Sequence, residues 1–220
     1  MKFVSFIFSA FLLSNIVQLQ AATLVSNLNE PLGTTFASYL NRYFATPFTI
    51  GDQSASIDRI DLPIFYSANG GSHFVELWAD AANLPDAPIM RLAGESHPTS
   101  NGVFGYTPTS ELTLSANTRY WLLVFSAVPG GATEQFHTTL SESETGYGQI
   151  LSPTLTAWEP PEWRALRWQT GIGLTPVTMQ FAVIGQQVPE PSFSILGLFF
   201  LACLTKLRRR MSCNAGLRLG

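Results

Sequence analysis

The sequence predicts an all-β fold, an antiparallel β-sandwich of jelly-roll type, between an N-terminal signal peptide and a short C-terminal membrane helix. Short runs of β-branched and aromatic residues recur through residues 23–187, as they do in strands. Turn residues such as Asn69-Gly70-Gly71 separate these runs. No window keeps a helical period beyond about two turns. About nine short strands in one body favour two packed sheets.

The expected strands follow one another at short intervals. The stretch 74–78 places apolar residues around Glu76, which should point outward because alternate strand residues face opposite sides. A turn over 84–88 should separate this strand from the next, and 115–118 should form a tight turn before a buried strand. In chain order the expected strands are 56–62, 74–78, 88–93, 103–107, 111–114, 119–125, 135–140, 164–169 and 177–184.

The body, residues 23–187, is acidic. It holds fourteen of the fifteen acidic residues and six of the twelve basic ones, with no lysine, so its formal charge is −8. The whole-chain charge of −3 hides this, because the other basic residues lie in the terminal segments. An acidic surface repels nucleic acid and anionic lipid, which argues against both as partners of the body.

Neither cysteine lies in the body, because Cys203 and Cys213 both follow it. An exported domain of this size without a disulfide must take its stability from its apolar core. Cys203 lies within the apolar C-terminal run, where packing is the simplest role for a thiol.

Residues 1–22 have the pattern of a secretory signal peptide. Lys2 supplies the positive start, and residues 3–13 are almost uniformly apolar. The small residues Ala21 and Ala22 then offer a cleavage site to signal peptidase. A retained N-terminal membrane helix is the alternative, but the small residues at the expected cleavage site argue against it.

The C-terminal end combines a stiff motif, a short apolar run and a cationic stop. Residues 191–205 carry no charge, and as a helix they would reach about 22 Å, against about 30 Å of membrane hydrocarbon. The segment is therefore a marginal anchor, and its basic side should stay in the cytoplasm with the tail 211–220. The motif is Val188, Pro189, Glu190 and Pro191, and the basic stop is Lys206, Arg208, Arg209 and Arg210.

This order of motif, apolar helix and arginine cluster over 188–210 resembles the PEP-CTERM sorting signal of proteins exported by Gram-negative bacteria that make exopolysaccharide. The resemblance implies recognition of residues 188–191 and cleavage by an exosortase, a membrane-embedded cysteine transpeptidase-like enzyme. The protein would be held in the inner membrane transiently and then reach the cell surface or extracellular matrix. The tail 211–220 departs from the family pattern, which ends at or just after the basic cluster. An ordinary short C-terminal anchor is the alternative.

The body over 24–185 is similar to the choice-of-anchor β-sandwich domains, which are exported modules joined to alternative C-terminal anchors. The resemblance rests on the stretch 112–124, with a turn at Asn117 and Tyr120-Trp121 in the strand that follows. The closest subtype of these domains has a glycine-containing turn before this stretch. Residues 83–86 stand at the corresponding place but lack those glycines. These domains have no established general activity, so the resemblance implies a fold and a location.

No residue set in the body predicts catalysis. His73, His97 and His137 are far apart in sequence, and the Gly-x-Ser-x-Gly and His-Glu-x-x-His patterns are missing. The carboxylates Glu159 and Glu162 share one proline-rich segment, which is a poor geometry for two groups opposed across a cleft. We therefore expect no enzyme, and an exported polysaccharide hydrolase is the alternative.

No cofactor is expected. Jelly-roll modules often hold a structural Ca²⁺ through carboxylate and carbonyl oxygens, and five aspartates lie near expected strand ends. The chain has no Asp-x-Asp-x-Asp-Gly loop, however, and a solvated acidic surface is the favoured explanation of these residues. The five are Asp52, Asp58, Asp61, Asp80 and Asp86.

Trp158, Trp163 and Trp168 fall within eleven residues, among glutamates and arginines. Exposed indole faces can stack on sugar rings, so the three are candidates for carbohydrate binding. Trp163 and Trp168 differ by an odd number, so along one strand they would face opposite sides and one would pack inward. Trp158 is then the exposed candidate, although packing is the favoured role for these tryptophans and sugar stacking the alternative.

The sequence thus predicts an exported, non-enzymatic cell-surface or matrix protein of a Gram-negative biofilm, with weak affinity for exopolysaccharide. Its expected domains are a signal peptide (1–22), a β-sandwich ectodomain (23–187), a sorting signal (188–210) and a cytoplasmic tail (211–220). Its expected partners are signal peptidase, an exosortase and, transiently, the inner membrane.

Overall fold

The computed structural model describes residues 21–39, 43–66, 71–126, 132–139 and 173–188, together with short strands between 144 and 170. Every regular element in these ranges is a β-strand, and every strand pair is antiparallel. The expectation of an all-β antiparallel fold is confirmed. Within the same ranges, no helix is long and apolar enough to cross a membrane.

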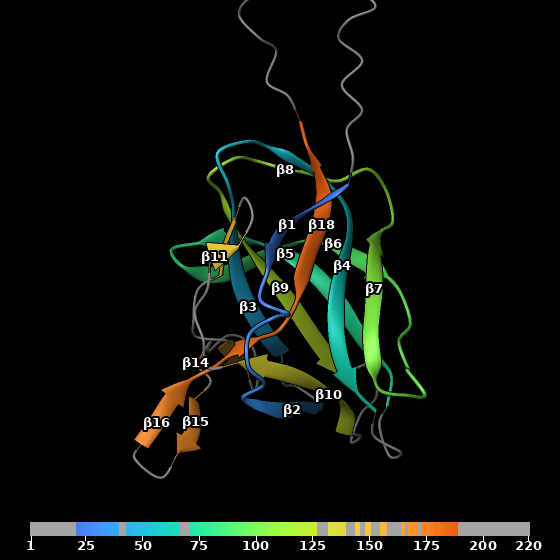
Figure 1. The fold of residues 1–220 in the computed structure, drawn as a ribbon, viewed down its shortest axis with the longest axis vertical. Helices are drawn as coiled ribbons and strands as arrows, with labels where there is room; N and C mark the ends of the chain where they lie inside the picture. Colours follow the sequence, from blue (N-terminus) through green and yellow to red (C-terminus); the bar gives the residue numbers. More distant parts are fainter. Residues whose placement is uncertain are drawn as a thin grey trace, which may run out of the picture. The chain divides into compact units, whose positions relative to one another are not determined.

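The main strands form two layers that join into a barrel-like sheet. One layer has the order β1–β18–β4–β7, and the other, behind it in Figure 1, has the order β6–β5–β9–β3. The layers meet where β6 pairs with β7 through two residue pairs. The bounds are β1 (Ala22–Ser26), β3 (Tyr43–Ile50), β4 (Ala55–Phe65), β5 (His73–Ala81), β6 (Leu84–Ala93), β7 (Gly102–Pro108), β9 (Arg119–Ser126) and β18 (Ala182–Gln187).

Shorter strands extend these layers. β10 pairs with β2, β4 and β17, β8 pairs with β4, and both β12 and β13 pair with β3. β15 and β16 form a separate two-stranded sheet. The bounds are β2 (Thr34–Tyr39), β8 (Thr113–Leu114), β10 (Ala132–Thr139), β11 (Glu144–Thr145), β12 (Gly148–Ile150), β13 (Leu155–Ala157), β14 (Arg164–Ala165), β15 (Arg167–Thr170), β16 (Gly173–Pro176) and β17 (Thr178–Met179).

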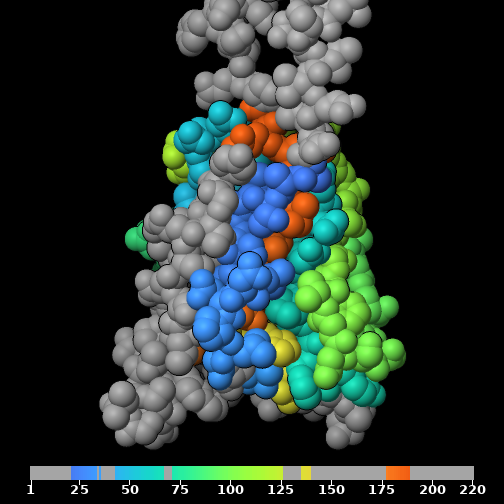
Figure 2. All heavy atoms as spheres, viewed as in Figure 1, coloured from blue at the N-terminus to red at the C-terminus, as the bar shows by residue number. Residues whose placement is uncertain are grey.

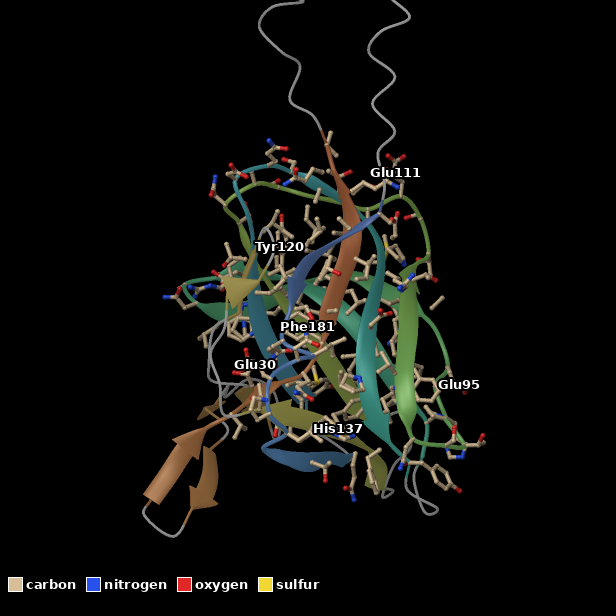
Figure 3. All side chains as sticks on the ribbon, in the orientation of Figure 1. Glu30, Glu95, Glu111, Tyr120, His137 and Phe181 are labelled. Atoms are coloured by element: carbon tan, nitrogen blue, oxygen red, sulfur yellow. The ribbon has the colours of Figure 1, made fainter. Side chains whose placement is uncertain are left out.

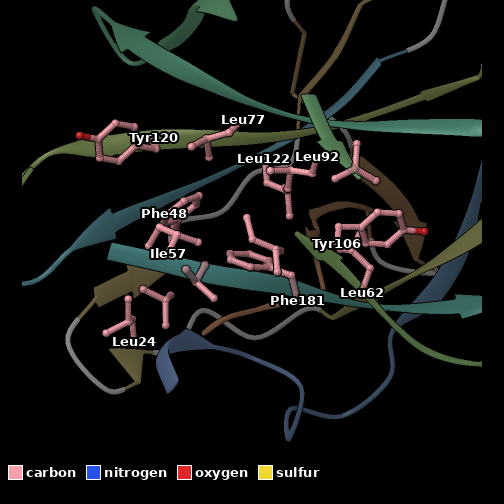
Figure 4. Packing of buried hydrophobic residues seen from close by; sticks show 14 of the residues in the cluster. Leu24, Phe48, Ile57, Leu62, Leu77, Leu92, Tyr106, Tyr120, Leu122 and Phe181 are labelled. Atoms are coloured by element: carbon pink, nitrogen blue, oxygen red, sulfur yellow. The ribbon is translucent and has the colours of Figure 1, made fainter. Parts of the chain in front are cut away.

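The apolar core lies between the two layers, as Figure 4 shows at close range. On one side, Leu77 of β5 and Leu122 of β9 are fully buried. On the other side, Ile60 and Leu62 of β4 are fully buried as well, and Phe181 packs against Phe48 with ring centroids 5.7 Å apart. Burying one such side chain stabilises a fold by about 1.5–3 kcal/mol, so a domain without cysteines can rest on this core.

Strand β4 explains why the alternation over 56–62 is irregular in the sequence. The pairing of β18 with β4 shifts register between Ile184 and Gly185, which leaves Asp58 as an extra residue on β4. This is a β-bulge, and it makes Asp58 and Arg59 both face solvent between two buried isoleucines. The bulge therefore changes the inside–outside pattern by one residue in the middle of the strand.

Strand β3 was not among the strands expected from the sequence, and it contains Pro47, a residue that is unusual in a central strand. The structure places β3 between β9 on one side and two short strands on the other. β12 pairs with Phe48–Ile50 and β13 pairs with Tyr43–Ala45, so neither reaches Pro47. Among the described residues, no strand therefore pairs with Pro47 on this side of β3, so a missing N–H there breaks no described ladder hydrogen bond.

The expected turn over 84–88 is wrong, because β6 occupies these residues. The chain reverses instead at Ala82 and Asn83, whose φ angles of 52° and 67° lie in the left-handed region. Two positive φ angles form the hairpin turn that matches the twist of the flanking strands. Pro85 and Pro88 pair with β5 at two shifts of register, where the regular ladder is already interrupted.

The other expected strands overlap observed ones, although the stretches 164–169 and 177–184 are each divided between two strands. The tight turn expected over 115–118 is confirmed. Asn117 has a φ of 51°, which asparagine tolerates better than most residues. Its backbone N–H donates to the Gly51 carbonyl oxygen at 2.7 Å.

The side chain of Asn27 connects the first and last parts of the sheet. Its Nδ2 donates to the Met179 carbonyl oxygen at 3.0 Å, and its Oδ1 accepts from the Phe181 backbone N–H at 2.7 Å. Gln180 adds a bond from Nε2 to the Glu30 carbonyl oxygen at 2.7 Å. Figure 3 labels two members of this network, Phe181 and Glu30. Asn27 is only 1% exposed, so these bonds form away from water.

Asn27→Ala is expected to lower the free energy of unfolding by about 2 kcal/mol, because it removes two buried hydrogen bonds to backbone groups. Urea unfolding at neutral pH measures this. Asn101→Ala is the matched control, since Asn101 is exposed and accepts one bond, from the Tyr66 backbone N–H at 2.8 Å. Equal midpoints for the two variants would contradict the prediction.

Candidate functional site

The structure describes only some of the candidate carbohydrate-binding and processing residues that the sequence suggested. Trp168 lies in β15, where its backbone pairs with Thr175. Ala21 is exposed, Ala22 is the first residue of β1, and Val188 is exposed directly after β18. The others lie outside the described residues: Trp158, Glu159, Glu162, Trp163, Pro189, Glu190, Pro191, Lys206, Arg208, Arg209 and Arg210.

A different group of aromatic residues gathers on the outer side of the β3–β9–β5 layer. Leu77 of β5 and Leu122 of β9 point into the core. The residues next to each of them along its own strand therefore point outward. The register places Trp78 directly opposite Trp121, and Phe125 between two further rings. We define the aromatic face as Tyr43, Phe74, Trp78, Trp121 and Phe125.

The aromatic face has a buried base and partly exposed rings. Ala45, Trp121 and Leu123 form the base, with Trp121 only 3% exposed, and Tyr43 and Trp78 pack onto it. The Phe125 ring centroid lies 5.0 Å from that of Tyr43 and 5.5 Å from that of Phe74. These separations are in the range of favourable aromatic pairs, so the rings hold one another in place.

Glu76 lies between Phe74 and Trp78 on β5 and binds two side chains, those of Trp78 and Arg91. Its Oε2 accepts from the Trp78 indole N–H at 2.9 Å. Its Oε1 accepts from Arg91 on β6, through Nε at 2.9 Å and a terminal nitrogen at 2.8 Å. The same guanidinium lies 4.0 Å from the centre of the Phe74 ring, a cation–π contact. Glu76 thus holds an indole and a guanidinium in fixed positions.

Asp80 plays the same role for the second indole. Its Oδ1 accepts from the Trp121 Nε1–H at 2.7 Å, and its Oδ2 accepts a longer bond of 3.4 Å from the Asn83 backbone N–H. Arg119 in turn donates to the Asn83 side-chain oxygen. Glu76 and Asp80 are thus balanced by Arg91 and Arg119, and the formal charge of this group is zero. Such a surface can bind a flat ligand with apolar ring faces and a polar edge.

Sequence reasoning missed this face, although part of its signal was present. Every second residue from Phe74 to Asp80 is aromatic or acidic, and the expectation that Glu76 points outward agrees with its place on this side of β5. The signal was incomplete because Arg91 and Trp121 come from other strands. Only the register of β5 with β6 and β9 brings them together.

His73 forms a second polar group, which is buried at the start of β5. The Tyr106 hydroxyl donates to the Glu95 carbonyl oxygen at 2.8 Å, so its oxygen accepts from His73 Nε2–H at 2.6 Å. His73 Nδ1 has no hydrogen-bond partner within the part of the chain that the structure describes. Phe136 meets the imidazole edge to face, with ring centroids 5.2 Å apart. Figure 3 labels Glu95 beside β7.

Burial lowers the pKa of His73 to about 4, with a smaller opposing effect of Glu95 and a further lowering by His97. Burial also lowers the pKa of His137, whose ring lies 6.3 Å from that of Phe65. Histidines held neutral in this way serve as hydrogen-bonding and packing groups at neutral pH.

Among the described residues, which include the five aspartates considered for Ca²⁺, no three His, Cys, Asp or Glu side chains gather closely enough to hold a metal ion. Two of these aspartates have other partners. Asp61 pairs with Arg59 at 2.9 Å, and Asp80 accepts from Trp121 as described above.

No protein-family model matches the chain, and comparison with curated proteins finds no match. Proposals about its function therefore rest on the sequence motifs and on the geometry described above.

Proposed function

We propose that the chain is an exported, non-enzymatic component of the cell surface or extracellular matrix, sorted through its Val188-Pro189-Glu190-Pro191 motif. Signal peptidase removes the N-terminal segment, and an exosortase recognises the motif and cleaves near it. The body is a jelly-roll sandwich of the choice-of-anchor kind, and it contacts exopolysaccharide weakly.

The observation that supports this proposal best is where the sheet begins and ends. β1 begins at Ala22, at the expected signal-peptide cleavage site, and β18 ends at Gln187, directly before the motif. The chain also divides into two compact units between Gln187 and Val188. Cleavage at either expected site would therefore leave the paired strands almost whole.

The pairing of β1 with β18 adds a second argument. Ala22 lies opposite Gly185 and Ser26 lies opposite Ala182, so β1 begins at the end of the sheet where β18 finishes. Figure 2 shows the two strands side by side on the surface. The start of β1 and the end of β18 thus lie at one end of the sheet, an arrangement that suits a domain processed at both termini with that end toward a membrane.

The test is intact mass spectrometry and cell fractionation of the full chain, expressed in a Gram-negative host that has an exosortase. The expected product starts at residue 22 or 23, ends near the motif, and is found outside the inner membrane. Pro189→Ala and Glu190→Ala should each abolish the C-terminal cleavage. Gln187→Ala, which lies just outside the motif, is the control and should be processed normally.

A full-length C-terminus retained in the inner membrane would show that the segment is an ordinary anchor and would overturn the sorting proposal. The non-enzymatic part has its own test, which is the release of reducing ends from polysaccharide. Release that disappears in Glu159→Gln or Glu162→Gln would support an exported hydrolase instead.

A further inference from the structure

We infer that the aromatic face is a binding site for a neutral polysaccharide, which lies along the outer side of β5 and β9. The inference names the ligand class and the location of the weak polysaccharide contact, and so rests on the proposed function. It moves this contact from the tryptophans around residue 160 to Trp78 and its neighbours.

The rings supply the apolar half of such a site. Sugar rings have apolar C–H faces that stack on aromatic planes, and a stack gains most when the aromatic ring is already held still. Trp78 meets this condition, because its N–H is bound to Glu76 at 2.9 Å and it packs on the buried base of Ala45, Trp121 and Leu123. It keeps part of its surface exposed.

Arg91 supplies the polar half. Its side chain is 52% exposed, while that of its partner Glu76 is only 11% exposed. Nε and one terminal nitrogen of Arg91 bond to Glu76, and the other terminal nitrogen makes no bond to another described residue. A guanidinium held by Glu76 and by the Phe74 ring can therefore donate to ligand hydroxyls without first losing side-chain freedom.

Charge decides which polysaccharide this site accepts. The charges of Glu76, Asp80, Arg91 and Arg119, the described residues that bond to the two indoles or brace their partners, cancel, so this group adds no excess positive charge to attract an anionic chain. The body carries a formal charge of −8, which repels polyanions at moderate salt. A polymer of uncharged sugars needs no positive charge on the protein and is not repelled by the acidic body. Its hydroxyls can accept from the remaining N–H groups of Arg91.

The experiment is co-sedimentation of the purified full chain, in mild detergent, with insoluble cellulose and insoluble β-1,3-glucan as neutral probes. Soluble polygalacturonate in gel retardation is the anionic probe. Trp78→Ala should weaken binding to at least one neutral glucan by about tenfold, the effect of losing one aromatic stack. Trp78→Tyr should keep most of the binding, because an aromatic plane remains. Val103→Ala, on β7 of the other layer and 58% exposed, should bind like the parent chain.

A second variant covers the case in which Trp78→Ala fails to fold. Arg91→Lys keeps the positive charge but loses the planar fork that reaches Glu76 and a hydroxyl together, and it should also weaken binding. Glucan binding that is the same in all these variants would overturn the site. Stronger binding to polygalacturonate would overturn the ligand class. If no probe binds while the chain is still processed at residues 188–191, this inference fails and the proposed export stands.

Discussion

Gly185→Ala is expected to lower the free energy of unfolding by about 3 kcal/mol or more, because it forces a methyl group into a packed backbone. An added Cβ would lie 2.2 Å from the Ser56 carbonyl oxygen, 3.2 Å from the Ile57 Cα and 3.0 Å from a Leu24 methyl group. Two of these three are backbone atoms of β4, at the bulge where β18 changes register. They can move only if the pairing of β4 with β18 is lost.

Urea unfolding of the parent and the variant measures this effect, and a large enough loss will appear as failure to accumulate folded protein. Gly102→Ala in β7 is the matched control. Its added Cβ would meet only the Phe104 ring, at 3.4 Å, which is an ordinary contact with a side chain. The control should be as stable as the parent, or slightly more stable since alanine restricts the unfolded chain. A Gly185→Ala variant with the stability of this control would refute the packing argument.

The domain is also expected to lose about 3 kcal/mol of stability as the pH falls from about 6.5 to about 4, through His73 alone. Burial lowers the His73 pKa from 6.5 to about 4 in the folded state. The unfolded chain then takes up a proton at a higher pH than the folded one, so acid favours unfolding throughout this window. Above about pH 6.5 both states are neutral at His73, and this contribution to stability is fully present.

His73→Phe isolates the contribution of this residue, because it keeps an aromatic ring beside Phe136 but cannot take up a proton. The free energy of unfolding, measured in urea at several pH values, should depend less steeply on pH in this variant between about 4 and 6.5. His97→Gln is the comparison, since His97 is exposed and has the smallest of the three effects on the His73 pKa, and it should keep most of the parent's pH dependence. If His73→Phe lost stability in acid as steeply as the parent, His73 would not be the group responsible.

Features that depend on neighbouring residues could be predicted from the sequence. The strands β4, β5, β7 and β9 were expected because apolar residues alternate locally and turn residues bound them. The turn at Asn117 was expected for the same reason, since asparagine favours the conformation it adopts there. The acidic charge of the body and the place of its three histidines outside any catalytic motif are also properties of the sequence alone.

Where local signals conflict with distant partners, the sequence misled. β3 was not among the expected strands, and its Pro47 is acceptable there because neither β12 nor β13 pairs with that residue. Pro85 and Pro88 suggested a turn, but the register shifts between β5 and β6 accommodate both in a strand. In each case the cost of a missing N–H depends on a partner strand that the local sequence does not reveal.

The sequence by itself determined the class of fold, the acidic character of the body, and the terminal motifs that suggest export and sorting. The tertiary structure alone decided which side chains share a surface. Arg91, Trp121 and Glu76 are up to 45 residues apart in the chain, yet they meet because β6, β5 and β9 pair in one register. The same is true of Asn27 and Phe181. Contacts between strands depend on long-range register, which local patterns of residues do not specify.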